Sequence, residues 1–326
     1  HSPTPVTGGL AIALGTIIPG LIIAEAEPAV VGLGLAALVL TIVGVLDDLF
    51  DLRWYVRLVA QVAAAAIIVV VGGVKVAYIG PVLGLHETAL NELSVPFTIL
   101  ATVGLINALN MIDGIDGLAG AMALCALAML GAASIYAGNL ELTNGLAVMI
   151  GAVGGFLAFN MRTPWRRRAA VFLGNSGSAY LGLVMAWCAF RLTQNPGHPV
   201  SPVLAPFLIA PPVIDCLVLM FRRLLHRKSP FAADRTHIHH LLLDAGFSVT
   251  GVVLALSVFS LLLGLAAGLA RLADVPPPAF VVAYIAITVG YFFWSMKPAR
   301  AAAMLRQLLR PGRAAPTVAE PSSSEA

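Results

Sequence analysis

The sequence predicts an all-α polytopic membrane protein, a bundle of about ten transmembrane helices. Hydrophobic residues make up 59% of the 326 residues and charged residues only 11%, whereas soluble domains carry roughly 25% charged residues. The mean hydropathy is +0.93, and the apolar residues form runs of the roughly 20 residues that a helix needs to cross a bilayer. The lipid bilayer is therefore the predicted partner, and the net charge of +3 predicts no nucleic-acid partner.

Ten segments reach the required length, with boundaries placed to within about three residues: 8–26, 28–46, 56–74, 95–113, 118–137, 143–160, 179–195, 202–221, 248–270 and 278–296. They predict a single membrane domain over residues 1–313, followed by a disordered cytoplasmic tail over 314–326 that is rich in Pro, Ser, Ala and Glu. Residue 1 is His rather than Met, and two prolines stand directly before the first apolar run. We therefore expect the natural start, with one earlier membrane span, to be missing.

The distribution of basic residues predicts the orientation of these segments. If their ends alternate between the two sides, sixteen of the 19 Lys and Arg residues fall on one side. The positive-inside rule makes that side cytoplasmic. Four polar clusters fall on the same side: Asp47–Asp51, Asn107–Asp116, Gly174–Ser178 and Asp234–His240. A transporter would place such residues near the bilayer midplane, so the pattern favours a site at the cytoplasmic surface.

The first cluster begins with two adjacent carboxylates. Neighbouring residues of a helix point about 100° apart, so Asp47 and Asp48 cannot share a face, whereas Asp47 and Asp51 can if the helix continues. This predicts divided roles, with one carboxylate directed toward a metal ion and another toward a substrate proton. The alternative is a solvated helix end that is neutralised by Arg53 and Arg57.

The second cluster is the most specific motif of the chain. Four polar residues repeat in it at three-residue spacing: Asn107, Asn110, Asp113 and Asp116. On a continuous helix they form a polar ridge along one face, while Gly114 and Gly117 permit a break in the helix. Carboxylate and amide oxygens are the ligands that Mg²⁺ prefers. The alternative is a polar seam between helices.

The third cluster, Gly174–Ser178, leads into the segment that begins at Ala179. A glycine-rich turn before a helix directs free N–H groups and the positive end of the helix dipole at an anion. The alternative is an ordinary turn in which Ser178 caps the helix.

The fourth cluster contains three histidines in four residues, His237, His239 and His240. Zinc is not favoured, because no cysteine or second ligand pair completes a tetrahedral set. Histidines and arginines that donate hydrogen bonds to a diphosphate fit better. Asp215, inside the preceding segment, is expected to orient a neighbouring helix or Arg222 rather than to perform chemistry.

Taken together and in this order, the four clusters resemble the polyprenyl-phosphate N-acetylhexosamine-1-phosphate transferase family, the glycosyltransferase 4 family that includes the WecA and TagO types and is related to MraY. The resemblance runs from Pro5 to His240, and the His-Ile-His-His form is similar to the WecA type. Members of this type have eleven spans, which is consistent with one span missing here.

The resemblance implies a Mg²⁺-dependent transferase, with Mn²⁺ as an alternative metal. It would move a sugar-1-phosphate, by default GlcNAc-1-phosphate, from a UDP-N-acetylhexosamine to undecaprenyl phosphate and release UMP. It also implies a multi-pass protein of the bacterial inner membrane with the active site facing the cytoplasm, acting in the first lipid-linked step of cell-surface polysaccharide synthesis. The resemblance leaves open whether the protein forms a homodimer.

The resemblance also assigns roles to residues. The catalytic residues would be Asp47, Asp48, Asp113 and Asp116. Substrate would be bound by Asn107, Arg235, His237, His239 and His240. The metal ion would be held by Asn110 and Asn175, together with Asp48.

One residue departs from the family pattern. The family has a metal-binding Asp at the position of Asn175. The amide keeps one carbonyl oxygen but lacks the negative charge, so affinity for the metal should fall. A metal-impaired homologue is therefore the alternative function, and a membrane transporter is a further alternative that the position of the polar clusters disfavours.

Overall fold

The computed structural model describes residues 4–23, 27–82, 84, 87–194, 200–229 and 236–309, and these ranges are helical apart from loops and two isolated β-bridges. The helices are α1 Gly8–Ile23, α2 Pro28–Phe50, α3 Trp54–Val70, η1 Asn91–Leu93, α4 Ser94–Ile112, α5 Leu118–Tyr136, α6 Leu140–Asn160, α7 Gly174–Thr193, η2 Pro202–Leu204, α8 Ala205–Leu208, α9 Ala210–Leu225, α10 Ile238–Asp244, α11 Val249–Leu272, α12 Pro277–Ser295 and α13 Pro298–Leu309. The predicted tail lies outside the described residues.

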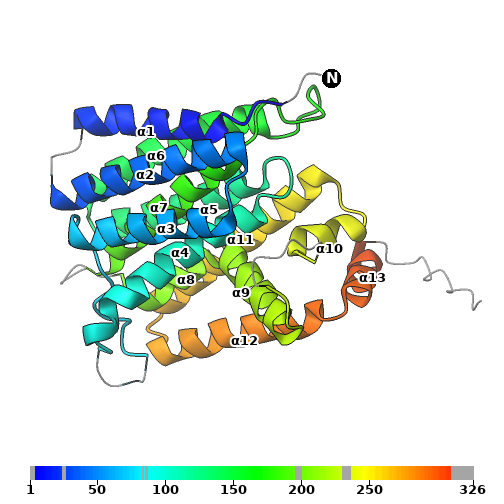
Figure 1. The fold of residues 1–326 in the computed structure, drawn as a ribbon. Coiled ribbons are helices and arrows are strands. Elements are labelled where there is room, and N and C mark those ends of the chain that lie inside the picture. The colour runs from blue at the N-terminus through cyan, green and yellow to red at the C-terminus, as the bar shows by residue number, and fades with distance from the viewer. Residues whose placement is uncertain are drawn as a thin grey trace, which may run out of the picture.

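The predicted all-α polytopic membrane fold is confirmed. Each of the ten predicted segments overlaps helix α1 to α7, the η2, α8 and α9 group, α11 or α12. Within the described ranges, six helices are long and apolar enough to cross a membrane, and α1 and α3 are shorter apolar helices. The chain is therefore a multi-pass helical bundle (Figure 1).

The predicted span 202–221 is not one straight helix. The η2–α8 part and α9 are bent by 83° relative to each other. The break falls at Ile209, whose backbone leaves the helical region with φ −126° and ψ 19°. Pro211 and Pro212 follow in the first turn of α9. Because proline has no N–H and clashes with the preceding turn, it is tolerated where a helix starts and not in its interior.

Helix α7 is the central helix of the bundle and is buried along most of its length. It packs against α1, α2, α4 and α5. Two glycines permit backbone contact at these crossings. A Cβ on Gly44 of α2 would lie 2.4 Å from Ser176 Cα, and one on Gly182 of α7 would lie 2.6 Å from Ile106 Cα. Small residues at helix crossings are a common feature of membrane bundles, because they let the backbones approach.

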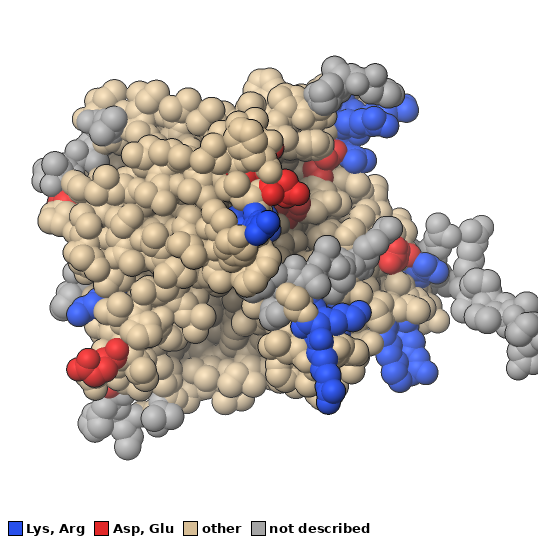
Figure 2. Space-filling model, in the orientation of Figure 1, with Lys and Arg blue, Asp and Glu red and all other residues tan. Residues whose placement is uncertain are grey.

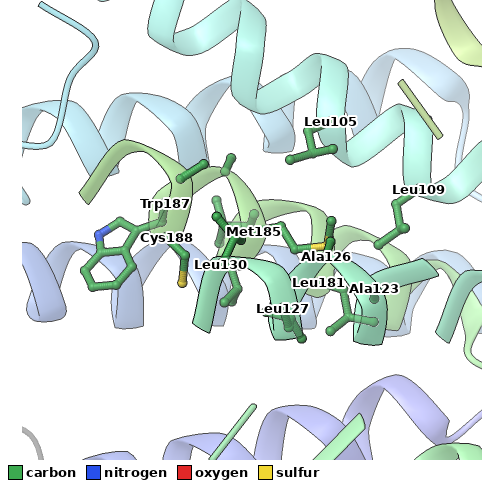
Figure 3. Close-up of a cluster of buried hydrophobic side chains, with 14 of the residues drawn as sticks. Leu105, Leu109, Ala123, Ala126, Leu127, Leu130, Leu181, Met185, Trp187 and Cys188 are labelled. Atoms are coloured by element: carbon green, nitrogen blue, oxygen red, sulfur yellow. The ribbon is translucent and has the colours of Figure 1, made fainter. Parts of the chain in front are cut away.

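Figure 3 shows the apolar contact between α4, α5 and α7. Leu105 and Leu109 of α4 and Leu127 of α5 face Leu181 and Met185 of α7, and all five side chains are buried. This packing holds the ends of α4 and α7 beside each other, which matters because both ends carry polar clusters.

The described parts of the four polar clusters lie at one end of the bundle, at the right in Figure 1. Most Lys and Arg side chains on the visible face of Figure 2 gather at this same end. The expectation that alternating helices bring the clusters together is therefore confirmed. Asp234 and Arg235 of the fourth cluster lie outside the described residues.

Candidate active site

A cavity of about 300 Å³ opens among these polar clusters. Its walls come from α2, α3, α4, α7 and α9, from Gly114 in the loop after α4, and from His237 and the first turn of α10. The polar lining is Asp47, Arg57, Gln61, Asn107, Asn110, Asn175, Arg223, His237, His239 and His240. The larger apolar lining residues are Leu40, Val43, Trp54, Leu58, Ile106 and Met111. The cavity thus combines groups that can bind an anion with an apolar wall.

Asp47 is buried in the cavity wall with 3% of its surface exposed. Its Oδ1 accepts the Leu52 N–H at 2.8 Å, and its Oδ2 forms an ion pair with Arg57 Nη1 at 3.2 Å. The predicted pairing of Asp47 and Asp51 on one helical face is wrong. Asp51 caps α2 in the left-handed conformation, with φ 51°, so the helix ends before a further turn can form.

Asp48 lies against the start of α7. Its Oδ1 accepts the N–H of Asn175 at 2.8 Å, and its Oδ2 accepts the N–H and Oγ–H of Ser176 at 3.3 and 3.0 Å. The anion expected at this helix N-terminus is therefore a carboxylate of the chain itself. A Cβ on Gly174, where φ is +77°, would lie 2.6 Å from Asp48 Oδ2, so glycine is needed there. Ser178 lies inside α7 and does not cap it.

The predicted polar ridge is interrupted. Asn107 and Asn110 lie on α4 as expected, but α4 ends at Ile112. Gly117 has φ +86° and precedes α5. Asp113 and Asp116 therefore lie in a loop, residues 113–117, rather than on the helix. We call this segment the acidic loop.

The two amides on α4 have partners on neighbouring helices. Asn107 Nδ2 donates to Gln61 Oε1 of α3 at 2.7 Å. Asn110 Nδ2 donates to Asn175 Oδ1 at 2.8 Å and to Ser178 Oγ at 3.0 Å, both in the first turns of α7. These bonds join three helices at the cavity.

The acidic loop is attached to the end of α6. Asp116 Oδ2 accepts from Arg162 Nε at 2.7 Å and from the Ala169 N–H at 3.2 Å. The Gly117 N–H donates to Asn160 Oδ1 at 2.7 Å. Asp113 carries no side-chain hydrogen bond to any described residue. Asp113 is exposed, yet the protein atoms packed around it, and then the negative charges of Asp48 and Asp116, raise its pKa to about 7.

His239 packs against the acidic loop at Gly114. His239 is 1% exposed, and neither ring nitrogen has a hydrogen-bond partner in the described ranges. A Cβ on Gly114 would lie 2.4 Å from His239 Nε2. The ring centroid of His239 lies 5.3 Å from that of His237 and 4.3 Å from that of His240. The fourth cluster therefore packs directly on the second, although the two clusters are far apart in sequence.

The sequence analysis did not identify several residues of the site. Gln61 and Asn160 are amides in otherwise apolar segments, a signal that could have identified them, whereas nothing local marks Arg162 as the partner of Asp116. The expectation that Asp215 orients Arg222 is wrong, because Asp215 accepts from His237 Nδ1 at 2.9 Å. The other expectation for Asp215, contact with a neighbouring helix, is met on α12.

The buried state of His239 makes stability depend on pH. Burial, and then the charges of His240 and His237, lower the pKa of His239 to about 4, which Asp215 partly opposes. The unfolded chain, with a histidine pKa of about 6.5, binds more protons between these values, so acidification through this window destabilises the fold. From pH 8 to pH 5 we expect wild type to lose about 2 kcal/mol more than His239→Gln. Thermal unfolding in detergent at both pH values measures this, and equal losses would contradict it.

The acidic loop has the kind of oxygen ligand that a divalent cation prefers. Mg²⁺ is commonly held by one or two carboxylates together with waters and substrate phosphates rather than by a full protein cage. Asp113 offers a carboxylate with no described hydrogen-bond partner, within the negative field of Asp48 and Asp116. Among the described residues no three Asp, Glu, His or Cys side chains form a ready metal set. The site therefore suits a metal that arrives with phosphate.

The fold and the cavity define a class of protein, namely a multi-pass helical membrane protein in which the carboxylate of Asp47, several amides and three histidines line one cavity at one end of the bundle. The family model of glycosyl transferase family 4 matches residues 30–193, and the chain belongs to this family.

Curated relatives from three bacteria share the name undecaprenyl-phosphate alpha-N-acetylglucosaminyl 1-phosphate transferase. The protein from Haemophilus influenzae is 33% identical over 64% of this chain, and that from Escherichia coli K12 is 32% identical over 64%. These alignments span 59% and 57% of the two relatives, so the chain matches somewhat more than half of their length. The protein from Yersinia pestis is 30% identical over 94% of this chain and 84% of its own length.

Proposed function

We propose that the protein transfers a sugar-1-phosphate, GlcNAc-1-phosphate in the first instance, from a UDP-N-acetylhexosamine to undecaprenyl phosphate and releases UMP. This would be the first lipid-linked step of a cell-surface polysaccharide. The names of the relatives support this proposal. The observation that carries it is the packing of the acidic loop, the start of α7 and the histidines around one cavity with an apolar wall.

The lining residues suit both substrates. Arg57 and Arg223 can neutralise phosphate groups, and the apolar side chains of α2 and α3 can contact the first part of a prenyl chain. The three histidines line the same cavity and can form hydrogen bonds to the nucleotide sugar. Asp47 and Asp48 are proposed to position the acceptor phosphate. Their present hydrogen bonds, to Arg57 and to the start of α7, fix both carboxylates in place.

We propose Mg²⁺ as cofactor, with Mn²⁺ as an alternative. When bound, the metal would neutralise charge on the diphosphate and on the departing UMP. We propose that Asp113 would hold it, together with Asn110 Oδ1, and neither has a hydrogen-bond partner among the described residues. Asp48 and Asn175 could also hold it, as the sequence suggested, because Asp48 Oδ1 and Asn175 Oδ1 each accept one hydrogen bond and keep a second lone pair.

We further propose that the protein lies in the bacterial inner membrane with the cavity facing the cytoplasm. The concentration of Lys and Arg at the cavity end supports this orientation. UDP-sugars are cytoplasmic substrates, which is consistent with the same side. A homodimer stays a hypothesis. The transporter alternative is not favoured, because the described polar clusters gather at one end of the bundle rather than at mid-depth.

The test is UMP release by the purified protein in the presence of a panel of UDP-sugars. We expect release, detected by mass, that requires both undecaprenyl phosphate and Mg²⁺ and stops with EDTA. A lipid product that carries the sugar phosphate should form in equal amount. No release with any UDP-N-acetylhexosamine would overturn the proposal.

Asn175 provides a test of the alternative, a metal-impaired homologue. The side chain accepts a hydrogen bond from Asn110 through Oδ1, and Asn175→Asp keeps that acceptor while adding a negative charge. We expect the variant to bind Mg²⁺ about tenfold more tightly, because the added charge favours a cation. The Mg²⁺ dependence of UMP release measures this.

Turnover at saturating Mg²⁺ separates the two functions. If wild type is a natural active form, its turnover should lie within about tenfold of the turnover of Asn175→Asp. Turnover that appears only in the Asn175→Asp variant would establish the impaired homologue instead.

A further inference from the structure

Asp215 is a buried carboxylate that reaches the histidines from behind the cavity. It lies on α9 and is 2% exposed. Its Oδ2 lies 2.9 Å from His237 Nδ1. Its Oδ1 accepts the Ile238 N–H at 3.1 Å and the Tyr291 Oη–H of α12 at 2.5 Å. An ionised carboxylate can only accept hydrogen bonds, so His237 Nδ1 must carry a hydrogen.

The other ring nitrogen of His237 faces a different environment. His237 lines the cavity, and its Nε2 has no hydrogen-bond partner among the described residues. In a neutral imidazole with the hydrogen on Nδ1, Nε2 presents a lone pair. In this tautomer Nε2 is therefore an acceptor rather than a donor, on a side chain that lines the cavity.

We propose that Asp215 is a positioning residue that holds His237 in the Nδ1–H tautomer, so that Nε2 accepts a hydrogen bond from a hydroxyl or N–H group of the bound substrate. The identity of that substrate, a UDP-sugar, rests on the proposed function. The tautomer itself does not, because it follows from the contacts of Asp215.

A second contact from α9 holds the same segment. Arg222 lies seven residues after Asp215, two turns along the same face. It donates to Thr236 and, through Nη1, to the Ser295 carbonyl of α12 at 3.0 Å. The residues on both sides of His237 are thus bonded to α9 side chains, and these same side chains are bonded to α12.

Asp215→Asn is expected to reverse the tautomer of His237. In wild type Oδ1 already receives two hydrogen bonds, from Ile238 and Tyr291. The carbonyl oxygen of the amide should keep that place, which turns the NH₂ group toward His237 Nδ1. Nδ1 must then accept, and the hydrogen moves to Nε2.

The measurement is the nitrogen chemical shifts of ¹⁵N-labelled histidine in the full chain at pH 8, with the His237 signals assigned by their loss in His237→Gln. Wild type should show the hydrogen on Nδ1, and Asp215→Asn should show it on Nε2. Tyr291→Phe removes one hydrogen bond but keeps the carboxylate, so it should retain the wild-type tautomer. A hydrogen on Nε2 in wild type would overturn the proposal without any variant.

Measurement of turnover tests whether this tautomer matters for the reaction. If UMP release is established, Asp215→Asn should lower kcat at least tenfold, while the thermal midpoint changes by no more than that of Tyr291→Phe. If Asp215→Asn shows the reversed tautomer but keeps the kcat of wild type, the positioning role is also overturned. If no substrate is turned over by wild type, the proposed function fails, yet the nitrogen shifts still decide the tautomer.

Discussion

Asp113→Asn is expected to lower kcat/KM for UMP release by about 10²- to 10³-fold, the usual cost of removing one preorganised electrostatic contact from an active site. The side chain keeps its shape and loses its charge. Asp113 has no described hydrogen-bond partner to lose, and its charge is opposed by Asp48 and Asp116. We therefore expect the thermal midpoint of the variant to equal or exceed that of wild type.

The diagnostic result for Asp113→Asn is lower activity without lower stability. Charged groups that repel one another at an active site reduce stability but serve function. Asp274→Asn is the matched control. Its carboxylate is 96% exposed and lies after α11, beside Arg271, away from the cavity. Turnover of the control should stay within about twofold of wild type. An Asp113→Asn variant with wild-type Mg²⁺ dependence and kcat/KM would show that the acidic loop does not carry the chemistry.

Gly114→Ala is expected to lower turnover by about 100-fold, since a displacement near 1 Å in an active site can have this effect. The added Cβ would lie 2.4 Å from His239 Nε2 and 2.9 Å from His239 Cε1, closer than real Cβ atoms approach. The ring must move away from the acidic loop. Steady-state kinetics and a crystal or cryo-EM structure of the variant measure the two parts of this expectation.

The control for this change is Gly104→Ala on α4, where a Cβ would meet no atom within 4 Å. Because alanine favours the helix, that variant should be as stable as wild type or more stable by up to about 1 kcal/mol. Its turnover should be unchanged. If Gly114→Ala also retains wild-type turnover, close contact between His239 and the acidic loop is not required.

The helices and their common end could be predicted from the sequence. Apolar runs of about 20 residues define membrane spans because unpaired backbone groups are not tolerated in lipid. Once the spans alternate, clusters at 47–51, 107–116 and 174–178 must fall at one end, as they do. The order and residue types of these clusters were sufficient to indicate the family that the chain belongs to.

The pairing of the polar groups could not be predicted. Asp48 with the start of α7, Asp116 with Arg162 and Asp215 with His237 join residues that are 127, 46 and 22 positions apart. A residue adds about 100° of rotation to a helix, so an error of two residues in a boundary turns a side chain to the opposite face. The end of α4 was predicted to within one residue, but α2 continues to Phe50, beyond the predicted 46, and Asp113 and Asp116 lie beyond the end of α4 rather than on its polar face.

What the sequence determined by itself is thus the membrane fold and the end of the bundle at which the polar residues gather, because hydropathy is a property of each segment alone. Only the tertiary structure decided which carboxylates are neutralised and which is left without a partner among the described residues. That outcome depends on contacts between helices, above all the glycine-mediated approach of α2, α4 and α7 and the packing of His239 on Gly114.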